Sequence, residues 1–226
     1  MKSHAIEISD LTFSYEAQGF ELNIPQLSIA EGKHVAIVGP SGCGKTTLAY
    51  LISGIHVPSG GNVDIGRDSI TRMTDGQRRD FRISNIGFIF QEFELLEYLR
   101  VEENIILPYL VNASLELDKA VYERARSLAE SVGLGDKLHR YPGELSQGEK
   151  QRLAICRALI TDPCIIMADE PTGNLDDGNT DAIMELILNQ ARRRNATFVR
   201  ITHEHHLLDR FDDVVDLAKN SGRNSG

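Results

Sequence analysis

Short apolar runs separated by turn residues dominate roughly the first 65 positions of the chain. Each run is shorter than an average helix, and turn residues separate the runs from one another, which favours strands. The runs span residues 5–8, 22–29, 34–38 and 62–65. Glycines follow the third run, and residues 46–53 then repeat apolar positions with helical spacing up to Gly54. This order predicts a strand, a glycine-rich loop and a helix.

A helical pattern occupies the middle of the chain, from about residue 94 to about residue 160. Its clearest part is a stripe of apolar residues that ends at Gly133. The stripe consists of Val121, Ala125, Leu128, Ala129 and Val132. Strand-like runs at residues 86–90 and 164–168 flank this region, so the helices are expected to be inserted into an α/β core.

Further strands and one helix complete the pattern after the insert. We expect a helix from about residue 180 to residue 194, a strand over residues 198–202 and a last short strand near Val214. The chain is therefore predicted to form one domain over residues 1–226. Its parts are a core of about residues 1–93 and 161–217, a helical subdomain of about 94–160 and a polar tail of 218–226.

Composition and charge narrow the range of partners. The formal net charge is −9, which argues against nucleic acid as a partner because Lys and Arg must neutralise its phosphates. The three cysteines, Cys43, Cys156 and Cys164, suggest neither a disulfide framework nor a zinc site, so a reducing cytosol is expected. Polar residues interrupt the N-terminus before a signal-peptide core, and no apolar run approaches membrane-spanning length. Any membrane role is expected to come through a partner.

The glycine-rich loop matches the phosphate-binding pattern G-x-x-x-x-G-K-[ST]. It consists of Gly39, Pro40, Ser41, Gly42, Cys43, Gly44, Lys45, Thr46 and Thr47. Glycines let backbone N–H groups close on phosphates, and the start of the following helix adds its positive end. We expect Lys45 to reach the β and γ phosphates, Thr46 to ligate Mg²⁺ and Thr47 to support a phosphate. The alternative is an ordinary glycine turn, but a strand before and a helix after are the context that this motif requires.

Two carboxylates follow the buried-looking strand at residues 164–168. Asp169 and Glu170 are expected at its carboxyl end, where ligands of open α/β sheets bind. Asp169 is predicted to lie on the Mg²⁺ side. Glu170 is predicted to point the other way, if strand geometry continues, and to polarise the attacking water as a general base. A solvated turn is the alternative for an isolated Asp-Glu pair.

A third motif points to a family. Residues 145–152, Leu-Ser-Gln-Gly-Glu-Lys-Gln-Arg, resemble the signature motif of ATP-binding-cassette (ABC) ATPases and lie upstream of Asp169 and Glu170, as in that family. Further family positions match in order along nearly the whole chain. The resemblance implies an aromatic that stacks on adenine, a glutamine that senses the γ phosphate, a D-loop aspartate and a switch histidine at Tyr15, Gln91, Asp176 and His203, respectively.

The same resemblance implies a fold and a metal site. The fold is a P-loop NTPase core with an N-terminal antiparallel β subdomain and an inserted α-helical subdomain. Mg²⁺ is expected at Thr46 and Gln91, with Asp169 reaching it through a water molecule. Within the family, residues 86–91, 102–108 and 168–176 look like the lipoprotein-release and macrolide-export branch.

ABC ATPases form head-to-tail dimers, which implies that each ATP lies between the glycine-rich loop of one copy and the signature motif of the other. The signature residues are Ser146, Gln147, Gly148 and Glu149, with a helix starting near Glu149. The usual pattern has Gly-Gly where this chain has Gln147 and Gly148. If position 147 requires a positive φ, a side chain there costs about 1 kcal/mol and hinders closure of the dimer. Glu149 replaces a common glutamine and is expected to be neutral.

Several of these positions have simpler interpretations. Tyr15 fits a core aromatic, and Gln91 fits the end of a strand. His203 belongs to Thr-His-Glu-His-His, residues 202–206, which also fits a metal site, although no cysteine or second ligand cluster accompanies it. His205 and His206 are expected to be surface residues.

The functional expectation is an ATP-hydrolysing subunit that binds ATP and Mg²⁺, forms a homodimer and drives a separately encoded integral membrane permease. It is expected in the cytoplasm, peripheral on the inner face of the cell membrane through that permease. One alternative is an ABC ATPase that regulates a membrane signalling complex without moving cargo. Another is a soluble ABC ATPase acting on DNA or ribosomes, but the long inserted coiled coil or second cassette typical of those forms is missing from this chain.

Overall fold

The computed structural model describes residues 4–15, 20–173, 177–204 and 207–220, and the side chains of 177–179 and 220 are outside this description. The chain divides into two compact units. The first unit comprises Met1–Arg82 and Ala196–Gly226, and the second unit comprises Ile83–Asn195. The chain therefore leaves the first unit once and returns to it after one long excursion.

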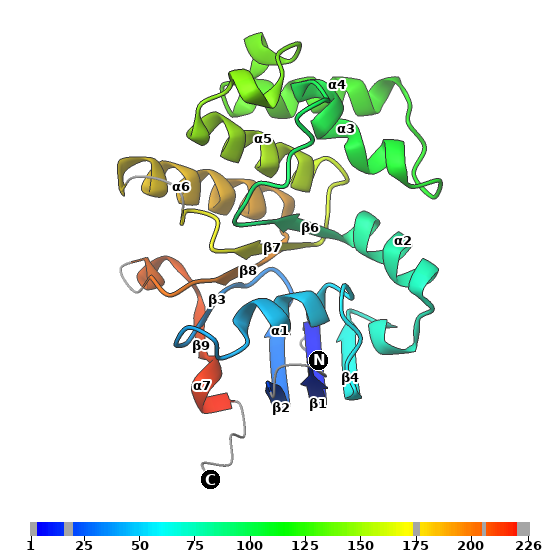
Figure 1. The fold of residues 1–226 in the computed structure, drawn as a ribbon, viewed down its shortest axis with the longest axis vertical. Coiled ribbons are helices and arrows are strands. Elements are labelled where there is room, and N and C mark those ends of the chain that lie inside the picture. The colour runs from blue at the N-terminus through cyan, green and yellow to red at the C-terminus, as the bar shows by residue number, and fades with distance from the viewer. Residues whose placement is uncertain (1–3, 16–19, 174–176, 205–206, 221–226) are drawn as a thin grey trace. The chain divides into compact units, whose positions relative to one another are not determined.

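An antiparallel sheet forms part of the first unit (Figure 1). Its strand order is β2-β1-β4-β5. The strands are β1 (His4–Ser14), β2 (Glu21–Ala30), β4 (Gly60–Ile65) and β5 (Asp68–Ser69). Ile8 of β1 pairs with Leu27 on one side and with Val63 on the other, and Ile6 and Ile8 are completely buried. Alternate residues along β1 therefore supply one apolar face, which confirms the expected antiparallel β subdomain.

Parallel strands form the other sheet of the first unit, with β3 (His34–Val38) between β8 (Thr197–Ile201) and β9 (Asp213–Asp216). Ile37 of β3 lies opposite Ile201 on β8 and Val215 on β9. All five residues of β3 and all five of β8 are buried, as is typical of parallel strands covered on both faces. Helix α1 (Lys45–Ile52) follows β3 after a short loop, in the predicted order of strand, loop and helix.

The start of β3 is fastened to β9 by a side chain as well as by the sheet. The backbone N–H of His34 donates to Oδ2 of Asp212 at 2.8 Å, and the backbone N–H of Asp212 donates to the carbonyl of His34 at 2.8 Å. The hydrogen bond from His34 is the main cause that holds the pKa of the Asp212 carboxyl below its usual value, with Lys33 adding its charge. The register of this strand pair is thus set at its first residue.

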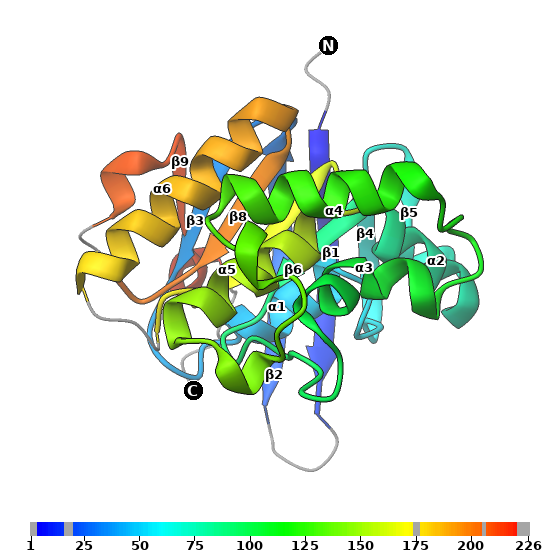
Figure 2. The same ribbon diagram turned by 90° about the horizontal axis from the view of Figure 1, so that it is seen from above.

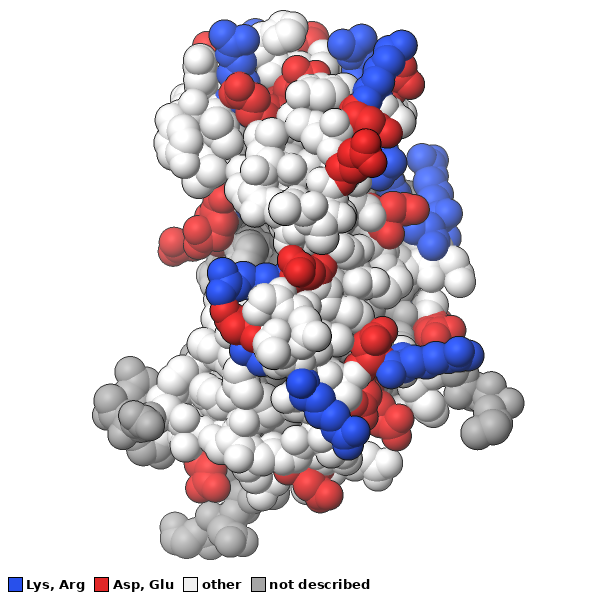
Figure 3. All heavy atoms as spheres, turned by 90° about the vertical axis from the view of Figure 1, so that its right-hand side faces the viewer, with Lys and Arg blue, Asp and Glu red and all other residues white. Residues whose placement is uncertain are grey.

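Helix α2 (Asp75–Asn85) occupies the basic, polar stretch in which the sequence predicted no element. None of its residues is buried, so no apolar stripe marks it. Asp75 in its first turn pairs with Arg79 one turn later and with Arg78 at 3.5 Å. Such pairs support a solvent-facing helix. A face of the molecule on which acidic and basic side chains are interspersed is shown in Figure 3.

The second unit combines two parallel strands with helices. Phe88 of β6 (Ile86–Ile89) lies opposite Met167 of β7 (Ile165–Asp169). The helices are α3 (Val101–Val111), α4 (Lys119–Ser131), α5 (Gln147–Leu159) and α6 (Asp177–Arg194). Helices α3, α4 and α5 pack against one another (Figures 1 and 2). The predicted stripe of α4 is buried from Val121 to Ala129, as its spacing required.

The C-terminal segment differs slightly from expectation. The segment predicted as a polar tail begins with the last three residues of a short helix, α7 (Leu217–Asn220). Single turns of 3₁₀ helix also occur. They are Ile70–Arg72, Gly135–Lys137, Pro142–Glu144 and Leu208–Arg210. The helical subdomain of about residues 94–160 stays a prediction, because the compact second unit is a larger segment.

Gly87 on β6 generates a test of the packing in the second unit. A Cβ atom at this position would lie 2.2 Å from the carbonyl oxygen of Ala158, at the end of α5. Gly87→Ala is therefore expected to lower the free energy of unfolding by about 1–3 kcal/mol, as overpacking does. Gly76→Ala is the control, because a Cβ there meets nothing within 4 Å and alanine favours α2 by up to about 1 kcal/mol. Urea unfolding measures both, and equal midpoints for the two variants would contradict the packing argument.

Candidate nucleotide and partner sites

The glycine-rich loop connects the buried strand β3 to α1 in the first unit. Gly44 is the N-cap of α1 and has a φ of 101°, a left-handed value that glycine adopts without strain. A Cβ atom on Gly44 would lie 2.8 Å from Cζ of Phe20. Both the backbone conformation and the neighbouring ring therefore require glycine at this position. The loop presents the start of α1 at the carboxyl end of β3, which is the arrangement that binds phosphates.

Lys45 is held inside the curve of this loop. Its ammonium donates to the carbonyl of Gly39 at 2.8 Å and to the carbonyl of Pro40 at 3.1 Å, and the residue is 8% exposed. Cys43 is buried and packs against Gly39, so its thiol faces the inside of the loop. Thr46 is exposed, whereas Thr47 is buried. An exposed hydroxyl at Thr46 is compatible with the predicted Mg²⁺ contact.

Tyr15 lies against this loop. It is half-buried, and its hydroxyl lies 3.4 Å from Oγ1 of Thr47 and 3.1 Å from Nε2 of His56. Its ring meets Phe13 edge to face, with centroids 4.9 Å apart, and Phe13 in turn stacks on His56. These contacts fix the ring beside the phosphate loop, as a platform for a nucleotide base requires.

His203 follows the carboxyl end of β8 and is exposed. The preceding residue, Thr202, donates its backbone N–H to the carbonyl of Ile37 at 3.1 Å, which ties this segment to β3. His205 and His206 lie outside the described residues. Within the described part of the chain, no group of three His, Cys, Asp or Glu residues is placed to hold a metal ion.

The acidic pair of the second unit lies at the end of β7. Asp169 is the last residue of the strand and is buried. Glu170 has a φ of 44°, so the strand geometry does not continue through it. The expected opposite direction of Glu170 and Asp169 assumed that the strand continues through Glu170, and this assumption is wrong. A left-handed backbone conformation turns the chain at this residue. It is uncommon for residues other than glycine, asparagine and aspartate.

Gln91 and Glu170 approach the same point of the second unit. Because β6 and β7 are parallel neighbours, the segments that follow them leave the sheet at one edge. A Cβ atom on Gly173 would lie 3.4 Å from Nε2 of Gln91 and 3.8 Å from Oε2 of Glu170. The amide and the carboxylate thus lie around Gly173. Asp176, the predicted D-loop aspartate, is outside the described residues.

The signature motif forms the N-terminus of α5. Ser146 is the N-cap, its Oγ accepts from the backbone N–H of Glu149 at 3.4 Å, and its backbone N–H donates to the Glu149 carboxylate at 2.8 Å. This backbone hydrogen bond is the largest cause that lowers the pKa of Glu149, and Lys137 adds an ion pair at 3.3 Å. Glu149 therefore completes a capping box, a role that glutamate and glutamine share at this position, and its expected neutrality stays a prediction.

Gln147 lies in the first turn of α5 and is not among the residues with positive φ. The helix starts at this residue, two positions earlier than expected. The condition under which Gln147 would strain the backbone is therefore not met. A glycine is not required at position 147 for any conformational reason in this chain.

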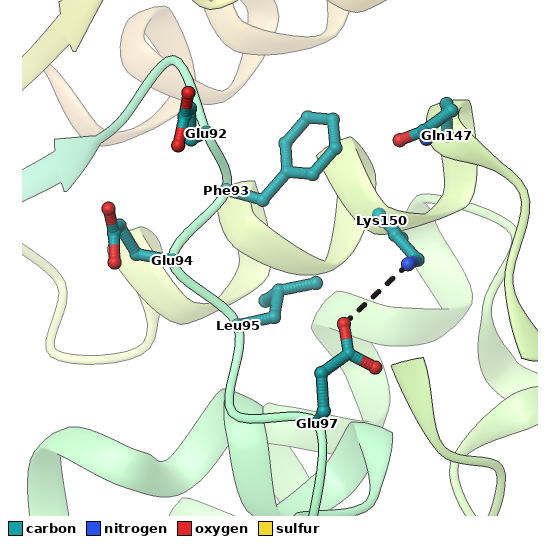
Figure 4. A pocket seen from close by; sticks show the side chains of 7 residues that line it. All are labelled: Glu92, Phe93, Glu94, Leu95, Glu97, Gln147 and Lys150. Atoms are coloured by element: carbon teal, nitrogen blue, oxygen red, sulfur yellow. Dashed lines mark ion pairs between the residues drawn. The ribbon is translucent and has the colours of Figure 1, made fainter. Parts of the chain in front are cut away.

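A cavity of about 600 Å³ lies beside the same helix start (Figure 4). Its lining joins the segment after Gln91 to the beginning of α5. The lining residues are Glu92, Phe93, Glu94, Leu95, Glu97, Gln147 and Lys150. Lys150 pairs with Glu97 at 3.6 Å, and the exposed Glu92 and Glu94 add two carboxylates to the same lining segment, on its side away from the Phe93 ring.

Arg157 of α5 holds this lining segment in shape. Its guanidinium donates to the carbonyl of Phe93 at 2.6 Å and to the carbonyl of Glu94. Phe93 and Glu94 have φ values of 48° and 51°, so the two hydrogen bonds stabilise a backbone that costs free energy by itself. Helix α5 therefore both lines the cavity, through Gln147 and Lys150, and holds the lining segment at Phe93 and Glu94 in place through Arg157.

Comparison with known proteins decides the family. The model of the family described as ABC transporter matches residues 22–173. The chain belongs to the ABC transporter family. It is an ATP-binding cassette of such a transporter, and its reaction is the hydrolysis of ATP. Cassettes of this family dimerise and energise a membrane permease. In the described residues, no helix is long and apolar enough to cross a membrane.

Individual relatives agree with this assignment. The lipoprotein-releasing system ATP-binding protein LolD of Rickettsia bellii is 42% identical over 191 residues, which cover 84% of this chain and 83% of the relative. LolD of Coxiella burnetii is 38% identical, with 86% and 83% covered. The dimeric structure of MJ0796, a bacterial ABC transporter cassette, matches with a TM-score of 0.81 at 29% identity and 94% of each chain. A post-hydrolysis structure of MJ0796 with ADP and Pi matches equally well, also at a TM-score of 0.81.

Two residues of this cassette were missed by the sequence analysis. His56 contacts Tyr15, yet a lone histidine after a helix gives no pattern that links it to position 15. Arg157 lies in the last turn of α5, where a basic residue is expected simply to complement the helix dipole. Long-range contacts of single side chains carry no periodic signal, so only the folded structure reveals them.

The helical conformation of Gln147 makes a testable claim about the cassette. Gln147→Gly is expected to lower the free energy of unfolding by up to about 1 kcal/mol, because glycine loses more backbone entropy in a helix. It is expected to leave the rate of ATP hydrolysis at or below that of the natural chain. Gln147→Ala serves as the control and should match the natural chain within a few tenths of a kcal/mol. A glycine variant that is more stable or faster would mean that position 147 needs the freedom of glycine.

Proposed function

We propose that two copies of this chain bind two ATP molecules between them and drive a separately encoded membrane permease. The observation that carries the proposal is that one chain holds both a phosphate loop at Lys45 and a capped helix start at Ser146. In a head-to-tail pair, two-fold symmetry turns these into two composite sites. The likeness to the dimeric MJ0796 cassette supports this arrangement.

Mg²⁺ fits the donor set of the proposed site. Thr46 supplies an exposed hydroxyl, Asp169 a carboxylate and Gln91 a side-chain amide, which are the oxygen ligands that Mg²⁺ prefers. We propose that Thr46 and Gln91 ligate the ion directly and that Asp169 reaches it through a water molecule. Bound there, the ion would neutralise charge on the phosphates. The neighbouring Lys45 contributes a second positive charge from the loop.

In the proposed mechanism, ATP closes the dimer and hydrolysis reopens it. Glu170 takes the proton of the attacking water as it bonds to the γ phosphorus, and His203 helps to align that water. The bond to the β-phosphate oxygen breaks, so that ADP and phosphate leave. Because the γ phosphate contacts both copies only in the closed state, its loss shifts the population to the open state. That motion is the work delivered to the permease.

Glu170→Gln tests both the catalytic role and the homodimer. The amide cannot accept the proton, so the turnover number is expected to fall by about 10² to 10⁴ while ATP binding is retained. The variant should therefore elute as a dimer from a sizing column in ATP and as a monomer without it. Glu185→Gln, on an exposed position of α6, is the matched control and should hydrolyse ATP normally. Normal hydrolysis by Glu170→Gln would refute the general base, and a monomer in ATP would refute the homodimer.

The permease is proposed to dock at the acidic cavity of the second unit. Cytoplasmic loops of membrane proteins carry an excess of Lys and Arg, which complement Glu92 and Glu94. Phe93 and Leu95, which alternate with these glutamates along the segment, offer apolar contacts. The resulting location is the cytoplasm, peripheral on the inner face of the cell membrane. The LolD relatives favour a permease of the lipoprotein-release branch.

Charge reversal tests the docking site. The double change Glu92→Lys and Glu94→Lys is expected to weaken binding to the permease that co-purifies from membranes by at least about tenfold, because like charges meet. Raising the salt concentration should weaken the natural pair and leave the reversed one less affected. Glu116→Lys is the control, because Glu116 is exposed in the same unit but does not line the cavity. Unchanged, salt-insensitive assembly of the double variant would exclude this surface.

A further inference from the structure

Strand β8 carries a charge in the interior of the first unit. All five of its residues are buried, and the fourth, Arg200, has no exposed surface. An arginine cannot lose its charge in a protein, and a buried charge is costly unless another charge compensates it. Ordinary parallel strands use an apolar residue at such a place. The buried guanidinium of Arg200 therefore requires an acidic partner.

Glu204 is that partner and lies just beyond the strand. The Nη2 group of Arg200 donates to Oε2 of Glu204, whose side chain is 23% exposed. The backbone N–H of Glu204 also donates to Oγ1 of Thr202 at 3.0 Å. Thr202 is itself buried and donates its backbone N–H to the carbonyl of Ile37 at 3.1 Å. The segment from Thr202 to Glu204 is thus fastened at both of its ends.

His203 is the residue between these two fastened positions, and it is exposed. Arg200 lies opposite Ala36 on β3, and β3 ends at Val38, directly before the phosphate loop. The histidine segment and the phosphate loop therefore depart from adjacent ends of one pair of strands. A shift of Glu204 would move the adjacent His203 and would also break the ion pair with Arg200.

We infer that the ion pair of Arg200 and Glu204 positions His203 for its role in ATP hydrolysis. Arg200 is fully buried and acts through Glu204, so it is a positioning residue. The ion pair with the buried Arg200 holds the side chain of Glu204 in one position, and this restrains the backbone of the adjacent His203. The inference rests on the proposed function of His203.

The decisive variant replaces the whole pair, R200M with E204Q. Replacing a buried ion pair by apolar groups of similar volume is often neutral or stabilising. Met replaces the fully buried member of this pair and Gln the partly exposed one, so the full-length variant should melt at about the temperature of the natural chain. If the pair positions His203, kcat should fall about 10- to 100-fold while KM for ATP and equilibrium binding of ATP stay unchanged. If the pair only stabilises the fold, kcat should be that of the natural chain, and this result would overturn the inference.

His203→Ala separates failure of the inference from failure of the proposed function. A normal kcat in His203→Ala would remove the role of the histidine, and the inference with it. If His203→Ala is slow and the double variant is normal, only the inference fails. If the pair acts through His203, adding His203→Ala to the double variant should lower kcat little further, since residues of one unit are not additive.

Glu204→Gln alone keeps the test available if the double variant does not fold. It retains the shape and an acceptor oxygen at this position but removes the charge. Assayed well below its melting temperature, it should show a kcat reduced several-fold with KM for ATP unchanged. Glu185→Gln is again the matched control. A kcat equal to that of the control would also overturn the inference.

Discussion

Strand β3 is hydrogen-bonded to a parallel strand on each side, and much of the first unit depends on this pairing. Parallel strands bury both faces, which explains why β3 is buried from end to end and is apolar after His34. They also bring their carboxyl ends to one edge, so the phosphate loop after Val38 and the His203 segment after Ile201 begin close together. The hydrogen bonds between His34 and Asp212 fix the register from the opposite end. Small shifts of this register would displace every group that follows.

Much of the fold was predictable because strands and glycine loops leave local signals. The runs at β1, β3, β7 and β8, the loop before α1 and the apolar stripe of α4 all follow rules of periodicity and glycine conformation. Helix α2 was not predictable by that route. It buries none of its residues and is supported by ion pairs along its surface. The sequence therefore has no apolar stripe at this helix that would predict it.

The candidate site was predictable in its residues and less so in its geometry. The motifs identified Lys45, Ser146, Asp169 and Glu170, but the conformation of Glu170 could not be obtained from them. Strand alternation is a sound expectation until a left-handed residue ends the strand, as Glu170 does. Phe93 and Glu94 show the same behaviour next to Gln91, with Arg157 compensating the cost. Backbone strain of this kind depends on tertiary contacts, which no local pattern encodes.

The capping box of α5 has an electrostatic consequence for the dimer. A helix start attracts anions because its N–H groups point outward, but Glu149 already offers its own carboxylate to Ser146. The carboxylate of Glu149 thus places a negative charge at the N-terminus of α5, which in the proposed dimer faces a phosphate of the ATP bound by the other copy. Lys137 balances that charge only in part, through one ion pair at 3.3 Å. Attraction at a distance is therefore weakened, and recognition at this half of the site must come from close hydrogen bonds and fit at short range.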